Sequence, residues 1–381
     1  MLPFARILEY GNVAPEPTPT IKIRDIVAGS NALLLITEDN DLWVRGNNAY
    51  GKLGIGTDTI VNITEWTKVR SDVKLACVSN LVCVVLTVDN KIFYCGDEWF
   101  ESGGSVSSKV VQWKDVTSQF SAVNLGTVRE MKMTYYCVGL VTTDNRLFAK
   151  GYDNNHSFGG ASSKVNAVLV ASNVSKLYTS LSSTIYSSTT GGYYRSGTST
   201  TGALGTSVNL TSYNLYSAPI FASECAVGMS TINSGILYYD TAGITRYVIA
   251  GQNSSYQLGA AIGNTSNLYS YTELTSVRDK FRDLWSDLNN SALSFAISKD
   301  GNTLYYAGTN NTLSSGDPGV AYSSTFKEVP FSFNNITKAA SLGYLSIVRD
   351  STGWYYSGDA TTLYGLPSSN TFTPLPLPPV V

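Results

Sequence analysis

Short apolar runs, separated by polar turn residues, recur along the chain. They are rich in leucine, β-branched and aromatic residues, and each is about as long as a buried β-strand. Such runs occupy residues 32–36, 82–86, 138–141, 293–297 and 344–348. The pattern therefore predicts an all-β protein made of many short strands.

A tight turn follows each apolar run. Asp-Asn and Asp-Gly pairs suit such a turn because these residues tolerate positive φ. The fourth copy has Thr-Thr-Gly-Gly at 189–192 instead. The aspartates are either local turn formers or a ring of carboxylates for a cation or a sugar; their presence in nearly every turn favours the local role. Six copies carry one, namely Asp39, Asp89, Asp144, Asp240, Asp300 and Asp350.

A short strand follows the turn and ends in a glycine. These glycines are Gly46, Gly96, Gly151, Gly197, Gly251, Gly308 and Gly358. Neighbouring copies are 46 to 57 residues apart, and six of the seven have an aromatic residue three positions before the glycine. One more strand precedes each apolar run, as at 23–28, and another follows the glycine, as at 64–69. Seven units of four short antiparallel strands predict a seven-bladed β-propeller.

The repeat divides the chain into three parts. Residues 1–22 form an extended N-terminal arm with a proline-rich spacer, residues 23–376 form the propeller, and residues 377–381 form a C-terminal tail. The proline-rich end of the chain is expected to join the last blade to the first, an arrangement that also allows strands from both termini to share a blade. The expected units are 23–69, 70–117, 127–172, 173–223, 224–276, 277–332 and 333–376.

A second motif follows the glycine in several copies. It reads Asn-Asn-Ala-Tyr-Gly-Lys-Leu-Gly at 47–54 and Gln-Asn-Ser-Ser-Tyr-Gln-Leu-Gly at 252–259. This motif resembles the repeat of the regulator of chromosome condensation family, which contains Trp-Gly-x-Asn-x-x-Gly-Gln-Leu-Gly. The resemblance implies a seven-bladed propeller. It implies no single function, because that fold serves exchange factors, inhibitors and scaffolds alike.

The composition excludes several classes of function. Charged residues make up 14% of the chain and the net charge is −2, whereas a nucleic-acid-binding protein normally has a basic face. No apolar stretch approaches the roughly 20 residues that span a bilayer. Residues 1–10 lack the pattern of a signal peptide, which counts against a secreted inhibitor. We therefore expect neither nucleic-acid binding nor membrane insertion.

Groups for catalysis or metal binding are scarce. His156 is the single histidine, so a two-histidine metal site is impossible, and no nucleophile or phosphate-loop motif is present. The five cysteines match no zinc pattern. Cys83 and Cys95 flank one hairpin and are either buried free thiols or a disulfide. We expect a protein that is not an enzyme and needs no cofactor.

Tyrosine is the most abundant aromatic residue, with 25 copies. Tyrosine combines a large contact area with a polar tip, which suits interfaces. Tyr50, Tyr256, Tyr269 and Tyr271 fall in expected loops. They are candidate interaction residues, with packing against their own blade as the alternative.

The N-terminal arm is mostly apolar and is followed by alternating prolines, which favour an extended, semi-rigid spacer. Phe4, Ile7, Leu8 and Tyr10 would be its contact residues. The arm either folds back onto the propeller or anchors the chain to another protein. The first twelve residues, Met-Leu-Pro-Phe-Ala-Arg-Ile-Leu-Glu-Tyr-Gly-Asn, are also similar to the starts of bacteriophage virion proteins that attach by their first residues.

The leading functional hypothesis from the sequence is a structural or binding component of a bacteriophage particle. The arm would contact other virion proteins, in a particle assembled in the host cytoplasm. The propeller would make assembly contacts or adhere to a host-surface glycan or protein. The alternative is an intracellular interaction scaffold or a GTPase nucleotide-exchange factor of the chromosome-condensation-regulator type.

Overall fold

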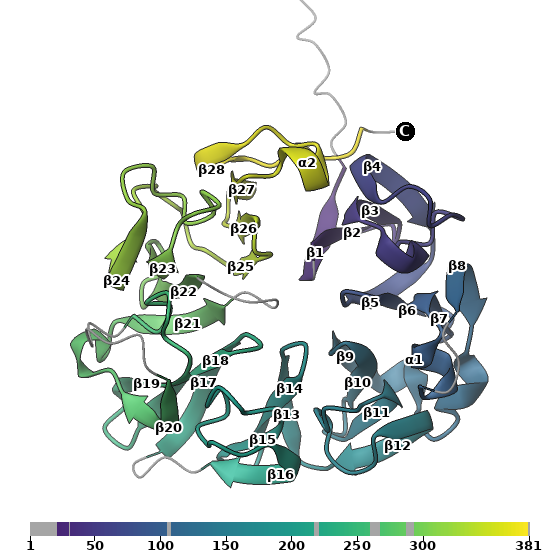
Figure 1. The fold of residues 1–381 in the computed structure, drawn as a ribbon, viewed down its shortest axis with the longest axis horizontal. Helices are drawn as coiled ribbons and strands as arrows, with labels where there is room; N and C mark the ends of the chain where they lie inside the picture. Colours follow the sequence, from purple (N-terminus) through teal and green to yellow (C-terminus); the bar gives the residue numbers. More distant parts are fainter. Residues whose placement is uncertain are drawn as a thin grey trace, which may run out of the picture.

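Seven four-stranded antiparallel sheets are arranged in a ring in the computed structural model (Figure 1). The structure describes residues 21–29, 31–104, 108–216, 221–259, 267–286 and 293–379. Every sheet is a simple meander in which each strand pairs with the next one along the chain. The predicted all-β, seven-bladed propeller is therefore confirmed, whereas the N-terminal arm lies outside the described residues.

The first four blades occupy the first part of the described chain. Blade 1 contains β1 (Ile23–Gly29), β2 (Ala32–Thr37), β3 (Leu42–Asn47) and β4 (Asn62–Arg70). Blade 2 contains β5 (Val73–Val78), β6 (Val82–Thr87), β7 (Ile92–Asp97) and β8 (Lys109–Asp115). Blade 3 contains β9 (Val128–Met133), β10 (Tyr136–Thr142), β11 (Leu147–Tyr152) and β12 (Ser163–Ala171). Blade 4 contains β13 (Val174–Thr179), β14 (Ser183–Ser188), β15 (Tyr193–Gly197) and β16 (Leu210–Tyr216).

The remaining three blades continue the same order. Blade 5 contains β17 (Phe221–Met229), β18 (Asn233–Asp240), β19 (Thr245–Gly251) and β20 (Leu268–Glu273). Blade 6 contains β21 (Phe281–Ser286), β22 (Leu293–Ser298), β23 (Leu304–Thr309) and β24 (Tyr322–Glu328). Blade 7 contains β25 (Lys338–Ser341), β26 (Leu345–Arg349), β27 (Trp354–Gly358) and β28 (Ser369–Pro374).

Helical structure in the described part of the chain is limited to single turns between strands. Two are α-helical, α1 (Trp99–Ser102) and α2 (Thr361–Tyr364). Four are 3₁₀ turns, namely η1 (Ala49–Gly51), η2 (Thr117–Phe120), η3 (Leu125–Thr127) and η4 (Thr275–Val277).

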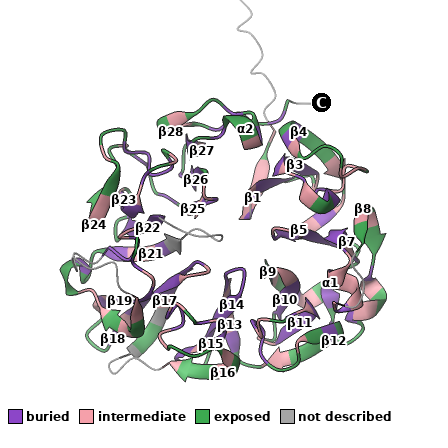
Figure 2. Cartoon of the chain, viewed as in Figure 1, coloured by how far each residue is buried: buried purple, intermediate pink, exposed green. Residues whose placement is uncertain are grey.

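Burial decreases from the second strand of a blade to its outer strand (Figure 2). All six residues of β2 and of β6 are buried, whereas β4 has exposed positions on either side of Trp66. The second strand is buried on both faces because neighbouring blades cover it, and in β2 and β6 it is therefore a continuous apolar run. The hydrophobic clusters lie between blades, as in the cluster that joins Tyr94 of blade 2 to Leu140 of blade 3.

The repeat glycines are required by the backbone. All seven have φ between +107° and +141°, a region that side chains other than hydrogen rarely allow. A Cβ atom on Gly96 would lie 2.1 Å from the carbonyl oxygen of Leu81. The glycine thus lets the third strand pass close to the loop that precedes the second strand.

The turn aspartates bond within their own hairpins. The carboxylates of Asp89 and Asp144 accept hydrogen bonds from the hydroxyls of Thr87 and Thr142. Asp240 accepts hydrogen bonds from the backbone N–H groups two and four residues further on, at 2.8 and 3.0 Å. These local contacts are those expected of turn formers.

Among the described residues, no blade shares strands from both ends of the chain. All strands of blade 1 come from the beginning of the described chain and all strands of blade 7 from its end, so the sharing of a blade that the sequence allowed is not observed there. Side chains hold the seam between blades 7 and 1 instead. Trp66 Nε1 donates a 2.8 Å hydrogen bond to the carbonyl oxygen of Pro376, and Trp66, Tyr356 and Tyr364 share one hydrophobic cluster. The C-terminal segment therefore joins the last blade to the first through contacts rather than through β-pairing.

Candidate binding site in the central channel

A basic residue recurs near the beginning of the innermost strand in several blades. Arg24, Lys74, Arg129 and Arg282 occupy this position in blades 1, 2, 3 and 6. The Arg24 guanidinium donates to the carbonyl oxygens of Val73 and Lys74 in the next blade, at 2.6 and 2.9 Å. These side chains therefore bridge neighbouring blades at one end of the channel.

The same contact is repeated around the ring. Arg129 donates to the carbonyl oxygens of Val174 and Ser175 at 3.0 and 2.6 Å, and Arg282 donates to that of Ile336 at 2.6 Å. Carbonyl oxygens at a strand edge have no partner within their own sheet, so a guanidinium from the previous blade satisfies them. The bridging arginines are thus committed to the fold.

The channel itself is a cavity of about 780 Å³, within the size range of ligand sites. Residues of the innermost strands of all seven blades line it. The lining contains six basic and three acidic side chains, a formal charge of +3 in a chain whose net charge is −2. The charged lining residues are Arg24, Lys74, Arg129, Lys132, Lys176, Lys338, Asp25, Glu130 and Asp283.

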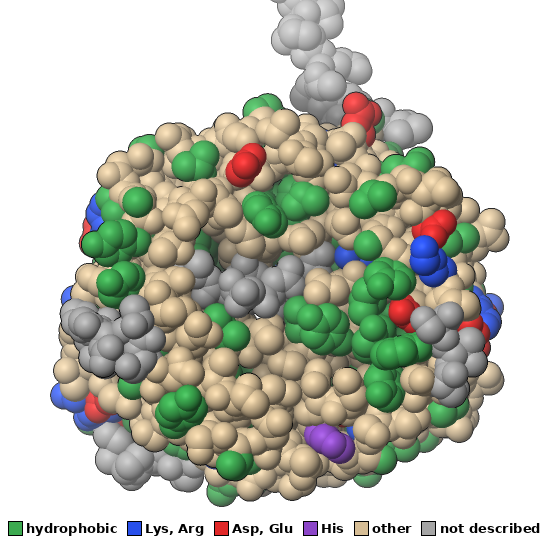
Figure 3. Space-filling model, in the orientation of Figure 1, with side chains coloured by type: hydrophobic (Ala, Val, Ile, Leu, Met, Phe, Trp, Pro, Cys, Tyr) green, Lys and Arg blue, Asp and Glu red, His purple; other side chains and the backbone are tan. Residues whose placement is uncertain are grey.

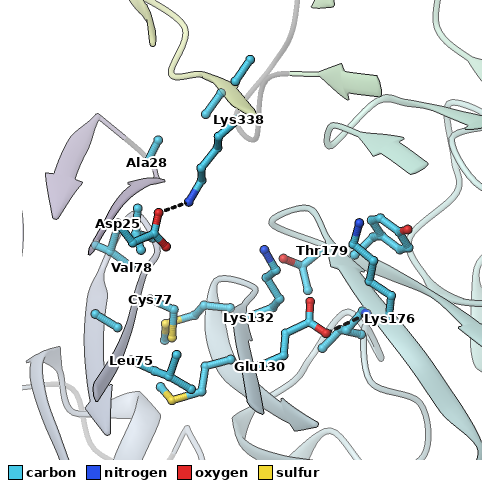
Figure 4. A pocket seen from close by; sticks show the side chains of 18 of the residues that line it. Asp25, Ala28, Leu75, Cys77, Val78, Glu130, Lys132, Lys176, Thr179 and Lys338 are labelled. Atoms are coloured by element: carbon cyan, nitrogen blue, oxygen red, sulfur yellow. Dashed lines mark hydrogen bonds and ion pairs between the residues drawn. The ribbon is translucent and has the colours of Figure 1, made fainter. Parts of the chain in front are cut away.

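Three lysines extend into the cavity from three different blades (Figure 4). Lys338 forms a 2.5 Å ion pair with Asp25, which closes the ring between blades 7 and 1. Lys176 Nζ lies 5.2 Å from the ring centroid of Tyr178. Lys132 has no ion-pair or hydrogen-bond partner among the residues that the structure describes. Within the described ranges, the cavity therefore contains positive charge that is only partly compensated by nearby carboxylates.

Burial shifts the ionisation of the channel groups. It lowers the pKa of Lys338, and the adjacent Asp25 carboxylate opposes that shift. It also raises the pKa of Asp283, whose carboxylate accepts a hydrogen bond from the neighbouring Leu284 N–H at 2.9 Å. Both shifts disfavour the charged form, because the channel wall replaces water around each group. A ligand of opposite charge would restore the lost solvation.

The outer surface differs from the channel. Charged side chains are sparse on the face shown in Figure 3 and most lie toward its rim. In the described ranges no group of three or more His, Cys, Asp or Glu residues is placed to hold a metal ion. None of the helices among these residues is long and apolar enough to cross a membrane. The chemistry that the geometry supports in the channel is binding of an anion.

The four candidate tyrosines do not form one site. Tyr50 is 38% exposed and its ring lies 5.8 Å from Lys109 Nζ in blade 2. Tyr256 stacks on Tyr322 with ring centroids 5.2 Å apart. The loops that carry Tyr50 and Tyr256 belong to blades 1 and 5, on different sides of the ring (Figure 1). A single interaction surface built from both is therefore not observed.

The segment expected as a loop around Tyr269 and Tyr271 is instead the outer strand β20. Tyr269 is 48% exposed. The hydroxyl of Tyr271 lies 2.8 Å from the Ser234 hydroxyl, and its ring centroid lies 4.5 Å from that of Tyr216 in blade 4. Tyr271 thus packs between blades 4 and 5, whereas the alternative interpretation placed it against its own blade alone. The arm residues Phe4, Ile7, Leu8 and Tyr10 lie outside the described residues.

The isolated histidine and the cysteines have ordinary environments. His156 Nδ1 lies 2.7 Å from the Gly160 carbonyl oxygen in a surface loop. Cys83 and Cys95 face each other as register partners in adjacent strands, and all five cysteines are free thiols. Burial raises the pKa of Cys83 above its usual range, which makes it a poor nucleophile.

The channel lysines are not among the site residues predicted from the sequence. A signal was present, because aligning the repeats places a basic residue at the same position of the innermost strand in four blades. Lys132, Lys176 and Lys338 come one to three residues after that position. Their convergence depends on the ring, since Lys132 and Lys338 lie four blades apart along the chain.

Comparison with known proteins supports the repeat and the fold. The model of the regulator of chromosome condensation (RCC1) repeat matches residues 23–52, which include β1 to β3 and η1 of blade 1. No curated protein sequence matches the chain significantly.

Solved structures with the same fold share little sequence with this chain. Prp20p from Saccharomyces cerevisiae is 14% identical, with a TM-score of 0.68 over 84% of this chain and 80% of Prp20p. Yeast RCC1 (Prp20) in a structure with Kap60 is 12% identical, with a TM-score of 0.71 over 97% and 91%. Human WBSCR16 is 12% identical, with a TM-score of 0.69 over 88% and 94%. At these identities the likeness shows a shared propeller fold.

Proposed function

We propose that this chain is a non-enzymatic protein-binding propeller that holds a partner protein at its central channel. The observation that carries the proposal is the cationic lining of the channel, in which Lys132 has no partner within the described ranges. Charged side chains are depleted in the chain as a whole, so their concentration around one cavity indicates a site. Complementary charge supplies specificity and rapid association.

The fold adds support of a general kind. A closed ring of blades presents its loops and its channel in a preformed arrangement, which lowers the entropic cost of binding. Prp20p, which has the same fold, has been described together with its binding to Gsp1p and histones. We extend to this chain only the use of the propeller as a platform for protein partners.

The test is affinity capture with charge-reversed channel variants. Lys132→Glu/Lys176→Glu reverses two exposed channel lysines, and Lys91→Glu/Lys299→Glu makes the same change in charge at exposed hairpin positions outside the lining. We expect quantitative mass spectrometry to find a protein that the wild type and the hairpin variant retain and the channel variant loses. Identical partner sets for all three proteins would refute the proposal.

A nucleotide-exchange role is a narrower form of the same function. The shared fold with Prp20p, which has been described with Gsp1p, favours testing it. The measurement is release of a fluorescent nucleotide from a small GTPase recovered in the capture experiment. Acceleration by the wild type and not by Lys132→Glu/Lys176→Glu would assign exchange activity to the channel end of the propeller.

Attachment to a virus particle remains a prediction from the sequence. It depends on residues 1–22, of which only residues 21 and 22 are described. Deletion of residues 1–14 tests it: particles that incorporate the truncated chain at the normal level would contradict the anchoring hypothesis. A location in the virion is part of the same prediction.

A further inference from the structure

We propose that the ligand of the central channel is an acidic peptide segment, an extended stretch of the partner protein whose Asp and Glu side chains bind Lys132, Lys176 and Lys338. The inference rests on the proposed function and specifies the chemistry that the channel recognises. It draws on the charge of the lining, on the distribution of that charge and on the backbone edges that face the cavity.

Lys132, Lys176 and Lys338 converge on the central channel. They come from blades 3, 4 and 7 and extend into one cavity (Figure 4). Lys132 and Lys176 are exposed, and neither forms an ion pair with another described residue. A lysine ammonium group has three hydrogen-bond donors on a flexible side chain, so it can bind a carboxylate in several positions. Lys132 and Lys176 can therefore bind carboxylates without breaking an ion pair between described residues, whereas Lys338 is already paired with Asp25.

The channel lining contains both basic and acidic side chains. Asp25, Glu130 and Asp283 lie among the basic residues of the lining. Glu130 is held in place, because its carboxylate accepts a 3.2 Å hydrogen bond from the Leu177 N–H. Fixed carboxylates of this kind repel a densely charged polyanion such as a polyphosphate. A peptide spaces its carboxylates along an extended chain, so they can approach the lysines and avoid Glu130 and Asp283.

The innermost strands have a free backbone edge within their own sheets. Each of them pairs with only one other strand in its sheet, so its second edge faces the channel. Arg24, Arg129 and Arg282 donate hydrogen bonds to carbonyl oxygens near the beginnings of the neighbouring innermost strands. Strand edges bind extended peptides through main-chain hydrogen bonds. Edge groups further along the strands suit a peptide better than a simple ion.

The apolar part of the lining also favours a peptide. Tyr178 lines the same cavity as the lysines, and Met131 and Met133 reach it from the hydrophobic cluster between blades 2 and 3 with 6% of their surface exposed. Methionine adapts to irregular surfaces and tyrosine offers a broad face with a polar tip. Such groups contact the carbon atoms of peptide side chains, whereas an inorganic anion would gain nothing from them.

The test measures direct binding by fluorescence anisotropy. The probe is a fluorescein-labelled peptide of alternating Glu and Ser, and its control replaces each Glu with Gln. The proteins are the wild type, Lys132→Gln/Lys176→Gln and the matched hairpin variant Lys91→Gln/Lys299→Gln. We expect the Glu peptide to bind the wild type and the hairpin variant alike, and the channel variant about tenfold or more weakly. Added salt should weaken the binding, because it screens exposed charges.

Three outcomes would overturn the inference. These are equal binding of the Gln peptide, equal binding by the channel variant, and binding of tripolyphosphate through these lysines in the absence of peptide binding. Unchanged circular dichroism and melting temperature of the variants exclude unfolding as the cause of a loss. If the Glu peptide fails while the captured partner still depends on Lys132 and Lys176, the acidic-peptide inference falls and the proposed function stands.

Discussion

Two buried lysines show how strongly the fold constrains single residues. Lys52 is 1% exposed and its ammonium donates a 3.0 Å hydrogen bond to the Asn80 carbonyl oxygen of the next blade. Lys150 is fully buried, and its ammonium donates to the Phe100 carbonyl oxygen and lies 3.9 Å from the Phe100 ring centroid. Burial lowers the pKa of each lysine to about 7. Each lysine connects two blades, and burying its ammonium group away from water has a cost in free energy.

This cost makes stability depend on pH. Between about pH 7 and the ordinary lysine pKa of 10.5, the folded state holds Lys52 and Lys150 neutral while the unfolded chain keeps them protonated. The unfolded state then binds more protons, so the free energy of unfolding rises with pH, by up to roughly 1 kcal/mol per pH unit for each lysine. Denaturant titrations from pH 7 to 9 should show a steeper rise for the wild type than for Lys52→Met/Lys150→Met. Parallel profiles would contradict the prediction.

The repeat glycine provides a second test at the residue scale. Gly96→Ala places a methyl group against the Leu81 carbonyl oxygen at a φ of +118°. We expect the free energy of unfolding to fall by about 1–3 kcal/mol, because both the backbone strain and the close contact must be relieved. Gly353→Ala is the control, since a Cβ atom there meets no atom within 4 Å. Chemical denaturation of both variants decides the matter, and equal losses would count against the stated reason.

Elements in this protein are joined to their neighbours by a small number of repeated contacts. Arg129 donates to the carbonyl oxygens of Thr142, Val174 and Ser175 and so connects β9 to β10 and to β13 of the next blade. Arg24 connects β1 to β5 in the same way. These bridges connect neighbouring sheets at the end of the channel where the basic residues gather.

Removing a bridging arginine should lower the free energy of unfolding, and the loss should grow with the number of carbonyl oxygens that are left without a donor. We expect Arg129→Ala to lower the free energy of unfolding by about 1–3 kcal/mol, because carbonyl groups at the blade junction lose their donor. Arg146→Ala removes an ion pair between side chains that are 41% and 51% exposed, and such pairs contribute about 1 kcal/mol or less. Thermal denaturation compares the two. A loss for Arg146→Ala as large as that for Arg129→Ala would show that the bridge is not the cause.

The elements were largely predictable from the sequence and the channel was not. Short apolar runs, Asp-Asn turns and glycines each depend on local backbone geometry. They therefore predicted the strands and hairpins of the blades. The assignment of 269–271 to a loop was wrong because post-glycine segments vary in length, and β20 begins only at Leu268. Lys132, Lys176 and Lys338 line the same cavity only because seven sheets close into a ring. Their spacing along the sequence does not indicate that they lie around one cavity.

At the scale of the whole molecule, the ring has one seam, between blades 7 and 1, and no described strand is shared across it. Blades 7 and 1 meet through one hydrophobic cluster, through the ion pair between Lys338 and Asp25, and through the hydrogen bond from Trp66 to Pro376. Every other pair of neighbouring blades is also connected along the chain. The seam is therefore the expected place for local opening of the ring.

Trp66→Phe tests the strength of this seam. It removes the N–H group that the Pro376 carbonyl oxygen accepts, so we expect a loss of about 1 kcal/mol and faster hydrogen exchange in blades 1 and 7. Trp43→Phe is a matched control in the same cluster, because Trp43 Nε1 is buried without an acceptor among the described residues. Hydrogen exchange followed by mass spectrometry locates the change. Faster exchange spread evenly over all seven blades would argue against a weak seam.

Each sheet of this propeller is encoded by one uninterrupted stretch of the chain. In evolutionary terms, the unit of inheritance and the unit of structure therefore coincide. A duplication or loss of one repeat would add or remove a complete blade and leave no strand without its sheet. The ring can change its number of blades, and with it the width of its channel, in single genetic steps.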